Sequence, residues 1–351
     1  MNRFLRICLV AAVVLVPHGC ADTQDTTHGN DAATEALTGE YLGQTPPGNE
    51  PALFAPGFIS TGLYERDVAM TPDGDEFYFG LISGATVTIA MSRRSGGEWS
   101  LPEILPAFSD PDIYNLEPHI TPDGSRMLFL STRPRVNQPK RSGWEYQDIW
   151  VMDRKDGDWG VPYNLGPPVC TDAPEYFPST TNDGTLYFTR SLTDGGRRRS
   201  LIFRSRLADS AYAEPELLPM EVNPGDNQFN ACVDPAERFL ILGIAGLPDN
   251  IGRYDYYVVF RNDDDTWTGP VNMGEKINTP GNSVISPSLS PDGRYFFFAS
   301  NRTAGGEERP PLDYQTIQNQ ATRPENGNAD IYWIDASFIE SLRPASAQPG
   351  E

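Results

Sequence analysis

Short apolar segments separated by tight turns recur along the chain. A turn motif flanked by apolar strands reads AMTPDGDEFYFG at 69–80, and it returns at 119–133, 179–190 and 288–302. The Asp-Gly pairs suit hairpin turns because glycine accepts a positive φ. The run after each turn is aromatic and β-branched, which is typical of a buried strand. A degenerate copy, CVDPAERFLILG, occupies 232–243.

Two further strands are predicted after each turn unit. Third apolar strands lie at 86–93, 148–154, 201–207, 255–261 and 330–336. An edge motif of Trp or Tyr, Pro and an apolar residue, each three apart, follows every unit except the last. Proline suits an outer strand because one side of that strand needs no ladder donor. Each unit therefore contains four strands, and repetition of one unit indicates a repeat architecture.

The edge strand that the last unit lacks has a counterpart near the other end of the chain. Pro51-x-x-Phe54 has the Pro and apolar spacing of the edge motif. An N-terminal strand that completes the last blade would close the ring and leave no open sheet edge. We predict an all-β, five-bladed β-propeller of four-stranded antiparallel blades over 41–344. A six-bladed ring is the alternative if 303–329 hides an eroded unit.

Three of these motifs resemble a known family. The Ser/Thr-Pro-Asp-Gly turn, the strand that ends in Ser-Asn-Arg at 300–302 and the Asp-Ile-Tyr third strand resemble TolB-like β-propeller repeats, the WD-repeat-like family with a Pro-Asp signature. The similarity covers about residues 41–340 and departs from the signature at 234–237, where DPAE replaces the turn. The resemblance implies the fold but not one function, since members include periplasmic binding and scaffold proteins, parts of envelope complexes and some enzymes.

The N-terminal segment reads as a targeting signal. Two arginines precede an apolar run at 7–16, which is too short to span a bilayer as a mature helix. Gly19-Cys20 resembles a bacterial lipoprotein cleavage site, so we predict a signal peptide over 1–19 and a lipidated Cys20 that anchors the protein in the bacterial cell envelope. The alternative is a soluble exported protein that is cut nearby.

The predicted ends of the mature chain are polar. A disordered tether is expected over 20–40 and a disordered tail over 345–351, because few apolar residues are available there to form a core. Of the two cysteines that remain, Cys170 and Cys232, we expect two separate buried thiols, although a disulfide stays open.

The charge excludes one class of partner. The chain has 27 basic and 48 acidic side chains and a net charge of −21 at pH 7. Loss of residues 1–19 removes two arginines and no acid, which lowers the charge from −21 to −23. So acidic a protein repels phosphate backbones, and nucleic acid is not an expected partner.

Residues that recur at one register are expected to be structural. They comprise arginines at the ends of second strands (Arg133, Arg190, Arg302) and aspartates at the starts of third strands (Asp148, Asp255, Asp330). We expect Arg–carboxylate pairs between these two groups to fix the loops on one rim. The tryptophans of the edge motif are expected to pack between blades, and the acidic run at 263–265 to form a solvated turn rather than a calcium site.

Polar residues peculiar to one blade are better candidates for function. Alignment of the units places five residues at one register near the start of the innermost strand: Asp67, Glu117, Phe177, Asn230 and Ser286. His119 lies two places further along, so it is expected to share a face with Glu117, and Glu175 enters near the same rim. These acids predict a ligand site at the channel mouth. The alternative is a polar ring satisfied by water.

The predicted loops on the same rim are basic. Residues 131–147 and 189–199 carry side chains that could hold an anionic ligand or an acidic partner, namely Arg135, Lys140, Arg141, Arg197, Arg198 and Arg199, with Trp144 and Tyr146 available for stacking. Loops on a rigid ring commonly carry recognition. Charge balance against nearby acids is the alternative.

No recognised catalytic motif is present. The sequence lacks a Gly-rich phosphate loop, HExxH and GxSxG, and after cleavage only His28 and His119 remain. We therefore expect no metal and no cofactor. The predicted function is a non-catalytic envelope propeller that binds a protein, peptide or glycan partner through its rim. The alternatives are a purely structural spacer and a glycan-active enzyme, similar to some five-bladed propellers, that uses Asp67, Glu117 and Glu175.

Overall fold

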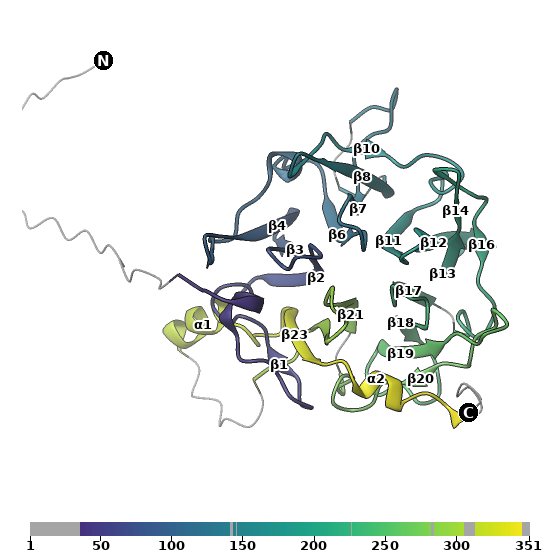
Figure 1. Cartoon of the computed structure of the whole chain (residues 1–351). Coiled ribbons are helices and arrows are strands. Elements are labelled where there is room, and N and C mark those ends of the chain that lie inside the picture. The colour runs from purple at the N-terminus through teal and green to yellow at the C-terminus, as the bar shows by residue number, and fades with distance from the viewer. Residues whose placement is uncertain are drawn as a thin grey trace, which may run out of the picture. The chain divides into compact units, whose positions relative to one another are not determined.

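Five four-stranded antiparallel sheets stand around a central channel (Figure 1). The computed structural model describes residues 36–140, 143–144, 146–225, 227–281, 284–304 and 313–345, within one compact unit that begins at Ala36. The predicted signal peptide, Cys20 and most of the tether lie outside the described residues. In the part of the chain that is described, no helix has the length and apolarity to cross a membrane.

The blades follow one another in sequence, and each runs from the channel outwards. Blade 1 contains β2 (Tyr64–Met70), β3 (Glu76–Ser83), β4 (Thr86–Ser95) and β5 (Glu98–Trp99). Blade 2 contains β6 (Asn115–Ile120), β7 (Arg126–Ser131), β8 (Asp148–Lys155) and β10 (Tyr163–Asn164), with the short β9 (Asp158–Trp159) beside β8. Blade 3 contains β11 (Glu175–Thr180), β12 (Leu186–Asp194), β13 (Arg197–Ser205) and β16 (Glu216–Leu217).

Blade 4 contains β17 (Asn227–Val233), β18 (Phe239–Ala245), β19 (Asp255–Phe260) and β20 (Val271–Asn272), and blade 5 contains β21 (Val284–Leu289), β22 (Tyr295–Ser300), β23 (Asp330–Asp335) and β1 (Ala52–Leu53). Short elements complete the fold: β14 (Leu207–Ala208), β15 (Ala211–Tyr212), the 3-10 turns η1 (Glu40–Gly43) and η2 (Pro106–Phe108), and the helices α1 (Tyr314–Ala321) and α2 (Phe338–Ser341). The six-bladed alternative is wrong, since the described part of 303–329 forms α1 and no further blade.

The ring closes as the sequence predicted. Strand β1 pairs antiparallel with β23, which joins purple and yellow segments in Figure 1, and the Phe54 N–H donates to Ile331 O at 2.8 Å. The Phe54 ring is fully buried and lies 4.9 Å from the Phe77 ring of blade 1 and 5.1 Å from the Trp333 ring of blade 5. One aromatic side chain therefore packs against both blades at the seam.

Each innermost strand contains a β-bulge at the register that the repeat alignment identified. The bulged residues are Asp67, Glu117, Phe177, Asn230 and Ser286, and their φ angles lie between 51° and 67°. A residue other than glycine pays about 1–2 kcal/mol for this left-handed conformation. Because this unfavourable conformation recurs in all five blades, the bulge is a conserved element of the repeat within this chain. It redirects one side chain in each blade.

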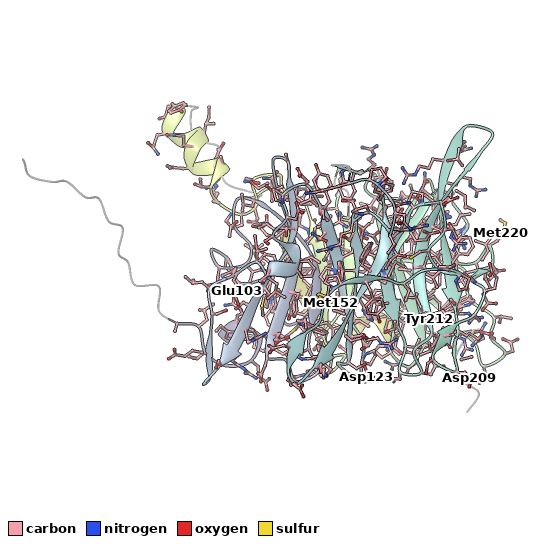
Figure 2. The ribbon with its side chains drawn as sticks, turned by 90° about the horizontal axis from the view of Figure 1, so that it is seen from above. Glu103, Asp123, Met152, Asp209, Tyr212 and Met220 are labelled. Carbon is pink, nitrogen blue, oxygen red and sulfur yellow. The ribbon has the colours of Figure 1, made fainter. Side chains whose placement is uncertain are left out.

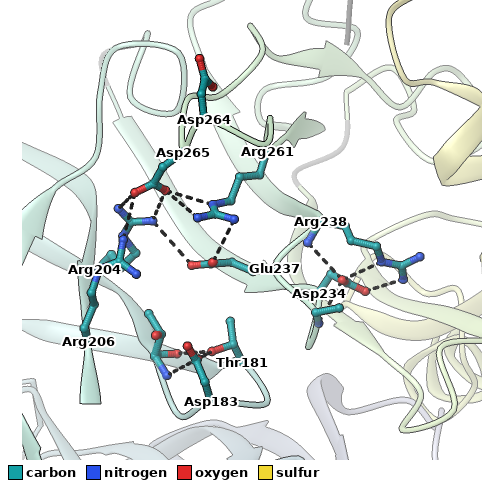
Figure 3. A network of polar contacts seen from close by, with 12 residues as sticks. Thr181, Asp183, Arg204, Arg206, Asp234, Glu237, Arg238, Arg261, Asp264 and Asp265 are labelled. Carbon is teal, nitrogen blue, oxygen red and sulfur yellow. Dashed lines mark hydrogen bonds and ion pairs between the residues drawn. The ribbon is translucent and has the colours of Figure 1, made fainter. Parts of the chain in front are cut away.

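In the degenerate turn of blade 4, Glu237 occupies the position that glycine has in the other turns, and ion pairs hold its side chain. Glu237 takes the left-handed position, with φ 58°. Its carboxylate pairs with Arg204 of blade 3 at 3.5 Å and with Arg261 at 3.4 Å, and Asp265 lies between the same two arginines (Figure 3). The acidic run at 263–265 forms an exposed turn, as predicted, and Asp265 in addition links blades 3 and 4. Its carboxyl pKa is lowered to about 2, chiefly by the hydrogen bond from Arg204.

The tryptophans of the edge motif pack between blades, as predicted. Trp159 of blade 2 donates its indole N–H to the Tyr78 hydroxyl of blade 1 at 2.7 Å. Trp267 of blade 4 meets Tyr187 of blade 3 with ring centroids 6.3 Å apart. Cys170 and Cys232 are both buried and unpaired.

The predicted pairing of strand-end arginines with third-strand aspartates is wrong. The guanidinium groups instead donate to backbone carbonyls that precede the innermost strand of their own blade: Arg133 to Ala107, Arg190 to Val169, and Arg302 to Ile277. Asp148 pairs with Arg135, whereas Asp255 and Asp330 accept backbone N–H groups. The arginines do recur for a structural reason, but their partners are backbone carbonyls, which no residue type in the sequence marks.

Candidate functional site

The channel mouth holds a buried cluster of one arginine and two acids. Arg66 donates from Nε to Asp67 at 2.7 Å and from Nη2 to Glu117 at 3.1 Å. The two carboxylates come from bulges of neighbouring blades, and their side chains are 0% and 7% exposed. The structure therefore brings Asp67 and Glu117 together, as predicted, and adds Arg66, which sequence reasoning missed.

Protein donors occupy both oxygens of each of these carboxylates. Asp67 Oδ1 accepts from the Ser286 hydroxyl, and Oδ2 accepts from Arg66 and from the Glu117 N–H at 3.3 Å. Glu117 Oε1 accepts from Arg66, and Oε2 accepts from the Phe177 N–H at 2.8 Å. Each bulged acid thus holds the backbone of the next bulge, so the cluster fastens blades 5, 1, 2 and 3 around the channel.

A glycine makes room for the cluster. Gly80 lies opposite Arg66 in the β2–β3 ladder, and a Cβ there would stand 2.7 Å from Asp67 Oδ2. The corresponding position in blade 3 is Thr189, whose hydroxyl accepts the Asn230 N–H at 3.1 Å. The backbone N–H of the bulged residue is thus bound by a threonine hydroxyl in blade 4, whereas in blades 2 and 3 it is bound by the carboxylate of the preceding bulge.

One guanidinium cannot neutralise two carboxylates. Burial raises the pKa of Glu117 to about 8, and the charge of Asp67 adds to the rise, while Arg66 and the Phe177 N–H oppose it. The pKa of Arg66 is raised by both acids, which outweigh its own burial. The cluster therefore retains one excess negative charge or one proton near neutral pH.

The prediction that His119 shares a face with Glu117 is wrong. The bulge between Leu116 and His119 breaks the two-residue alternation. The His119 Nε2 atom accepts the Thr180 N–H at 3.0 Å and lies 2.8 Å from the Thr180 hydroxyl. Because Nε2 accepts, the neutral ring carries its proton on Nδ1. Burial lowers the pKa of His119 to about 4, so the ring is neutral at physiological pH.

His119 belongs to a cavity at the other mouth of the channel, near the hairpin turns. The lining includes Thr180, Cys232 and Ser288 from three further blades. Cys232 and Ser288 lie two residues beyond the bulged Asn230 and Ser286, as His119 lies two residues beyond Glu117, and the three side chains line one space. The lining residues include no carboxylate and no further basic side chain, and the Cys232 thiol is the one other titratable group among them.

Glu175 does not join the channel acids. Its carboxylate accepts from Arg190 at 2.8 Å and from the Thr171 hydroxyl at 2.6 Å. Among the described residues, Asp148, Cys170 and Glu175 place ligand atoms within 4.8 Å of one another. Arg135 pairs with Asp148 through Nε at 2.7 Å, so an arginine already neutralises each acid of this group.

The predicted rim residues divide into two sets. Arg135 is 27% exposed and committed to Asp148, and Lys140 pairs with Asp110 and Asp112 at 3.0 Å. Residues 197–199 are exposed, and they belong to a regular extension of the β12–β13 hairpin rather than to the predicted loop. This teal hairpin rises from the disc on the side opposite to Asp123 (Figure 2). Arg141 lies outside the described residues.

An exposed aromatic residue accompanies the hairpin on this rim. Trp144 is 48% exposed, and its ring meets Tyr114 edge-on with centroids 5.0 Å apart. Tyr114 directly precedes the innermost strand of blade 2, and the Tyr176 hydroxyl of blade 3 donates to Ser200 at the base of the hairpin, at 2.9 Å. The rim thus combines guanidinium groups with aromatic surface, as predicted, although through different local structure.

Comparison with known proteins finds distant structural similarity alone. No protein-family model matches the chain, and a search of curated proteins also finds no match. TolB from Acinetobacter baumannii is 16% identical with a TM-score of 0.42, over 77% of this chain and 56% of its own. A thermostable family-43 glycoside hydrolase is 15% identical with a TM-score of 0.43, over 77% and 89%. A GH62 hydrolase in complex with xylotriose is 9% identical with a TM-score of 0.43, over 79% and 91%.

Proposed function

We propose that this protein is a non-catalytic propeller of the bacterial cell envelope that binds an acidic partner, whether protein, peptide or glycan, through the rim that carries the β12–β13 hairpin. Lipidated Cys20 would anchor it to the membrane. One observation carries the proposal: three consecutive exposed arginines, at 197–199, lie on a projecting hairpin of a protein whose net charge is −21. Such a local contrast steers an acidic partner toward that surface.

The hydrogen bonds of the three candidate acids weigh against the enzyme alternative. A general acid or nucleophile must reach substrate with a free oxygen. All six carboxylate oxygens of Asp67, Glu117 and Glu175 accept hydrogen bonds from this chain. For Asp67 and Glu117, engaging a substrate would break contacts that hold neighbouring blades together, and for Glu175 it would break the pairing with Arg190 and Thr171, which favours a structural role for these acids.

The test compares two variants with the same change in charge. Arg198→Ala with Arg199→Ala removes two positive charges from the hairpin, and Arg126→Ala with Lys155→Ala removes two from the opposite, turn-bearing face. The full-length lipoprotein is used to capture partners from detergent-solubilised native envelope at low salt. We expect the hairpin variant to lose partner capture about tenfold, since each lost contact contributes of order 1 kcal/mol, and the control variant to retain it. Equal capture by both variants would remove the hairpin from the proposal.

A further inference from the structure

Two junctions between blades are built from the same residues. At the junction of blades 2 and 3, the Glu175 N–H donates to Gln147 O at 2.9 Å, next to Asp148 at the start of β8. At the closure seam between blades 5 and 1, the Glu65 N–H donates to Ala329 O at 2.8 Å, next to Asp330 at the start of β23. Each junction therefore sets a glutamate beside an aspartate.

The surroundings of the two junctions match as well. The Thr171 hydroxyl donates to Glu175 Oε1 at 2.6 Å, and the Thr61 hydroxyl donates to Glu65 Oε1 at 2.5 Å. The preceding residues also correspond, because Cys170 donates to Ile149 O at 3.5 Å and Ser60 donates to Ile331 O at 3.2 Å. The repeat thus supplies an internal comparison for the seam.

The junctions differ in what neutralises the acids. Arg190, opposite Glu175 in the ladder, and Arg135 bind the two carboxylates between blades 2 and 3. At the seam Leu81 is opposite Glu65, and Ala304 takes the place of Arg135 by register from Ser300. Arg302, just after β22 in blade 5, donates to the carbonyls of Lys276 and Ile277 instead.

No cation among the described residues compensates the two seam carboxylates. Glu65 and Asp330 are each 1% exposed. Glu65 Oε2 and Asp330 Oδ1 are buried and accept a hydrogen bond from none of the described residues. Neither acid forms an ion pair within the described part of the chain. Burying an unpaired, ionised carboxylate costs several kcal/mol of folding free energy. Burial raises the pKa of Asp330 to about 7, and the nearby charge of Glu65 contributes to this rise.

We propose that the closure seam binds one divalent cation of the calcium class through Glu65 Oε2 and Asp330 Oδ1, in the place that arginine side chains fill between blades 2 and 3. The donor atoms decide the class of cation. Ser60 occupies at the seam the position that Cys170 has in the other junction, so an oxygen replaces the sulfur there. Carboxylate oxygens and water are the ligands that hard cations prefer. Because β1 closes the ring at this seam, the ion strengthens closure. This inference departs from the sequence-based expectation that no metal is bound, and it is independent of the proposed function.

Calcium binding to the full chain tests this inference. The protein is stripped with EDTA, exchanged to pH 8 and titrated with CaCl2 by calorimetry, with MgCl2 as a comparison. We expect one calcium ion per chain and, at a hundredfold excess of free ion over the dissociation constant, a rise in Tm of about 4 °C. Glu65→Gln and Asp330→Asn should each abolish binding and the rise in Tm. The matched control, Glu175→Gln, changes the equivalent acid of the other junction and should still bind calcium.

A gain-of-charge variant keeps the test decisive if the acid variants fail to fold. Leu81→Arg places a guanidinium where Arg190 stands in blade 3, so it should remove calcium binding and raise the Tm of the calcium-free protein. Wild-type protein that binds no calcium, or binding that survives both Glu65→Gln and Leu81→Arg, would overturn the inference. Stability that falls from pH 6 to pH 8 without any response to calcium would also overturn it, since a proton shared between the two acids would then replace the cation.

Discussion

Arg66 is the residue on which the channel cluster depends most directly. Arg66→Met keeps an unbranched side chain of similar length but leaves Asp67 and Glu117 without their shared cation. Both acids are nearly fully buried, at 0% and 7% side-chain exposure, so water cannot replace the guanidinium. Removal of one partner from a buried ion pair costs about 3–5 kcal/mol. We expect a loss of this size in the free energy of unfolding at pH 8.

The loss should depend on pH in a defined direction. Without Arg66 the pKa of Glu117, which burial already raises, rises further in the folded state, whereas it stays at its ordinary value in the unfolded state. The folded protein then binds more protons than the unfolded chain, and stability falls as pH rises. Urea unfolding followed by tryptophan fluorescence at pH 5 and pH 8 should therefore show a smaller loss at pH 5.

Two variants make this prediction refutable. Arg126→Met breaks an exposed pair with Asp153, whose side chains are 38% and 56% exposed, and should cost less than about 1 kcal/mol. Asp67→Asn with Glu117→Gln, added to Arg66→Met, should recover part of the loss at pH 8 because no buried charge is left. If Arg66→Met lowers the free energy of unfolding at pH 8 by no more than Arg126→Met does, the ion pairs of the buried cluster do not stabilise the fold as its geometry indicates.

Two further predictions concern the same channel. The imidazole resonance that disappears in His119→Gln should titrate near pH 4 by NMR; because this pKa lies below the ordinary value of 6.5, the contribution of His119 to stability should be lost as pH falls from 6.5 through 4, and a titration near 6.5 would contradict its burial. Gly80→Ala should lower the free energy of unfolding by about 1–3 kcal/mol, because its Cβ would meet Asp67 Oδ2 at 2.7 Å and Leu116 Cδ2 at 2.8 Å. Gly269→Ala, whose Cβ meets nothing within 4 Å, is the matched control for urea unfolding.

The candidate site could be predicted only in part. Repeat alignment found the register of Asp67 and Glu117 correctly, since one register recurs in every blade. It could not find Arg66, because nothing in the local pattern distinguishes a strand arginine that turns inward from one that faces solvent. It also misplaced His119, because the two-residue alternation holds only where no bulge intervenes.

The sequence by itself determined the repeat, the four strands of each blade and the strand near Pro51 that closes the ring, because turn chemistry and apolar alternation are local properties of the chain. Only the tertiary structure decided which charges are compensated. Glu175 and Glu65 occupy equivalent positions in their strands, yet an arginine faces one and a leucine faces the other. Charge compensation depends on which side chains the blades bring within a few ångströms of each other, and that proximity arises only when the ring is assembled.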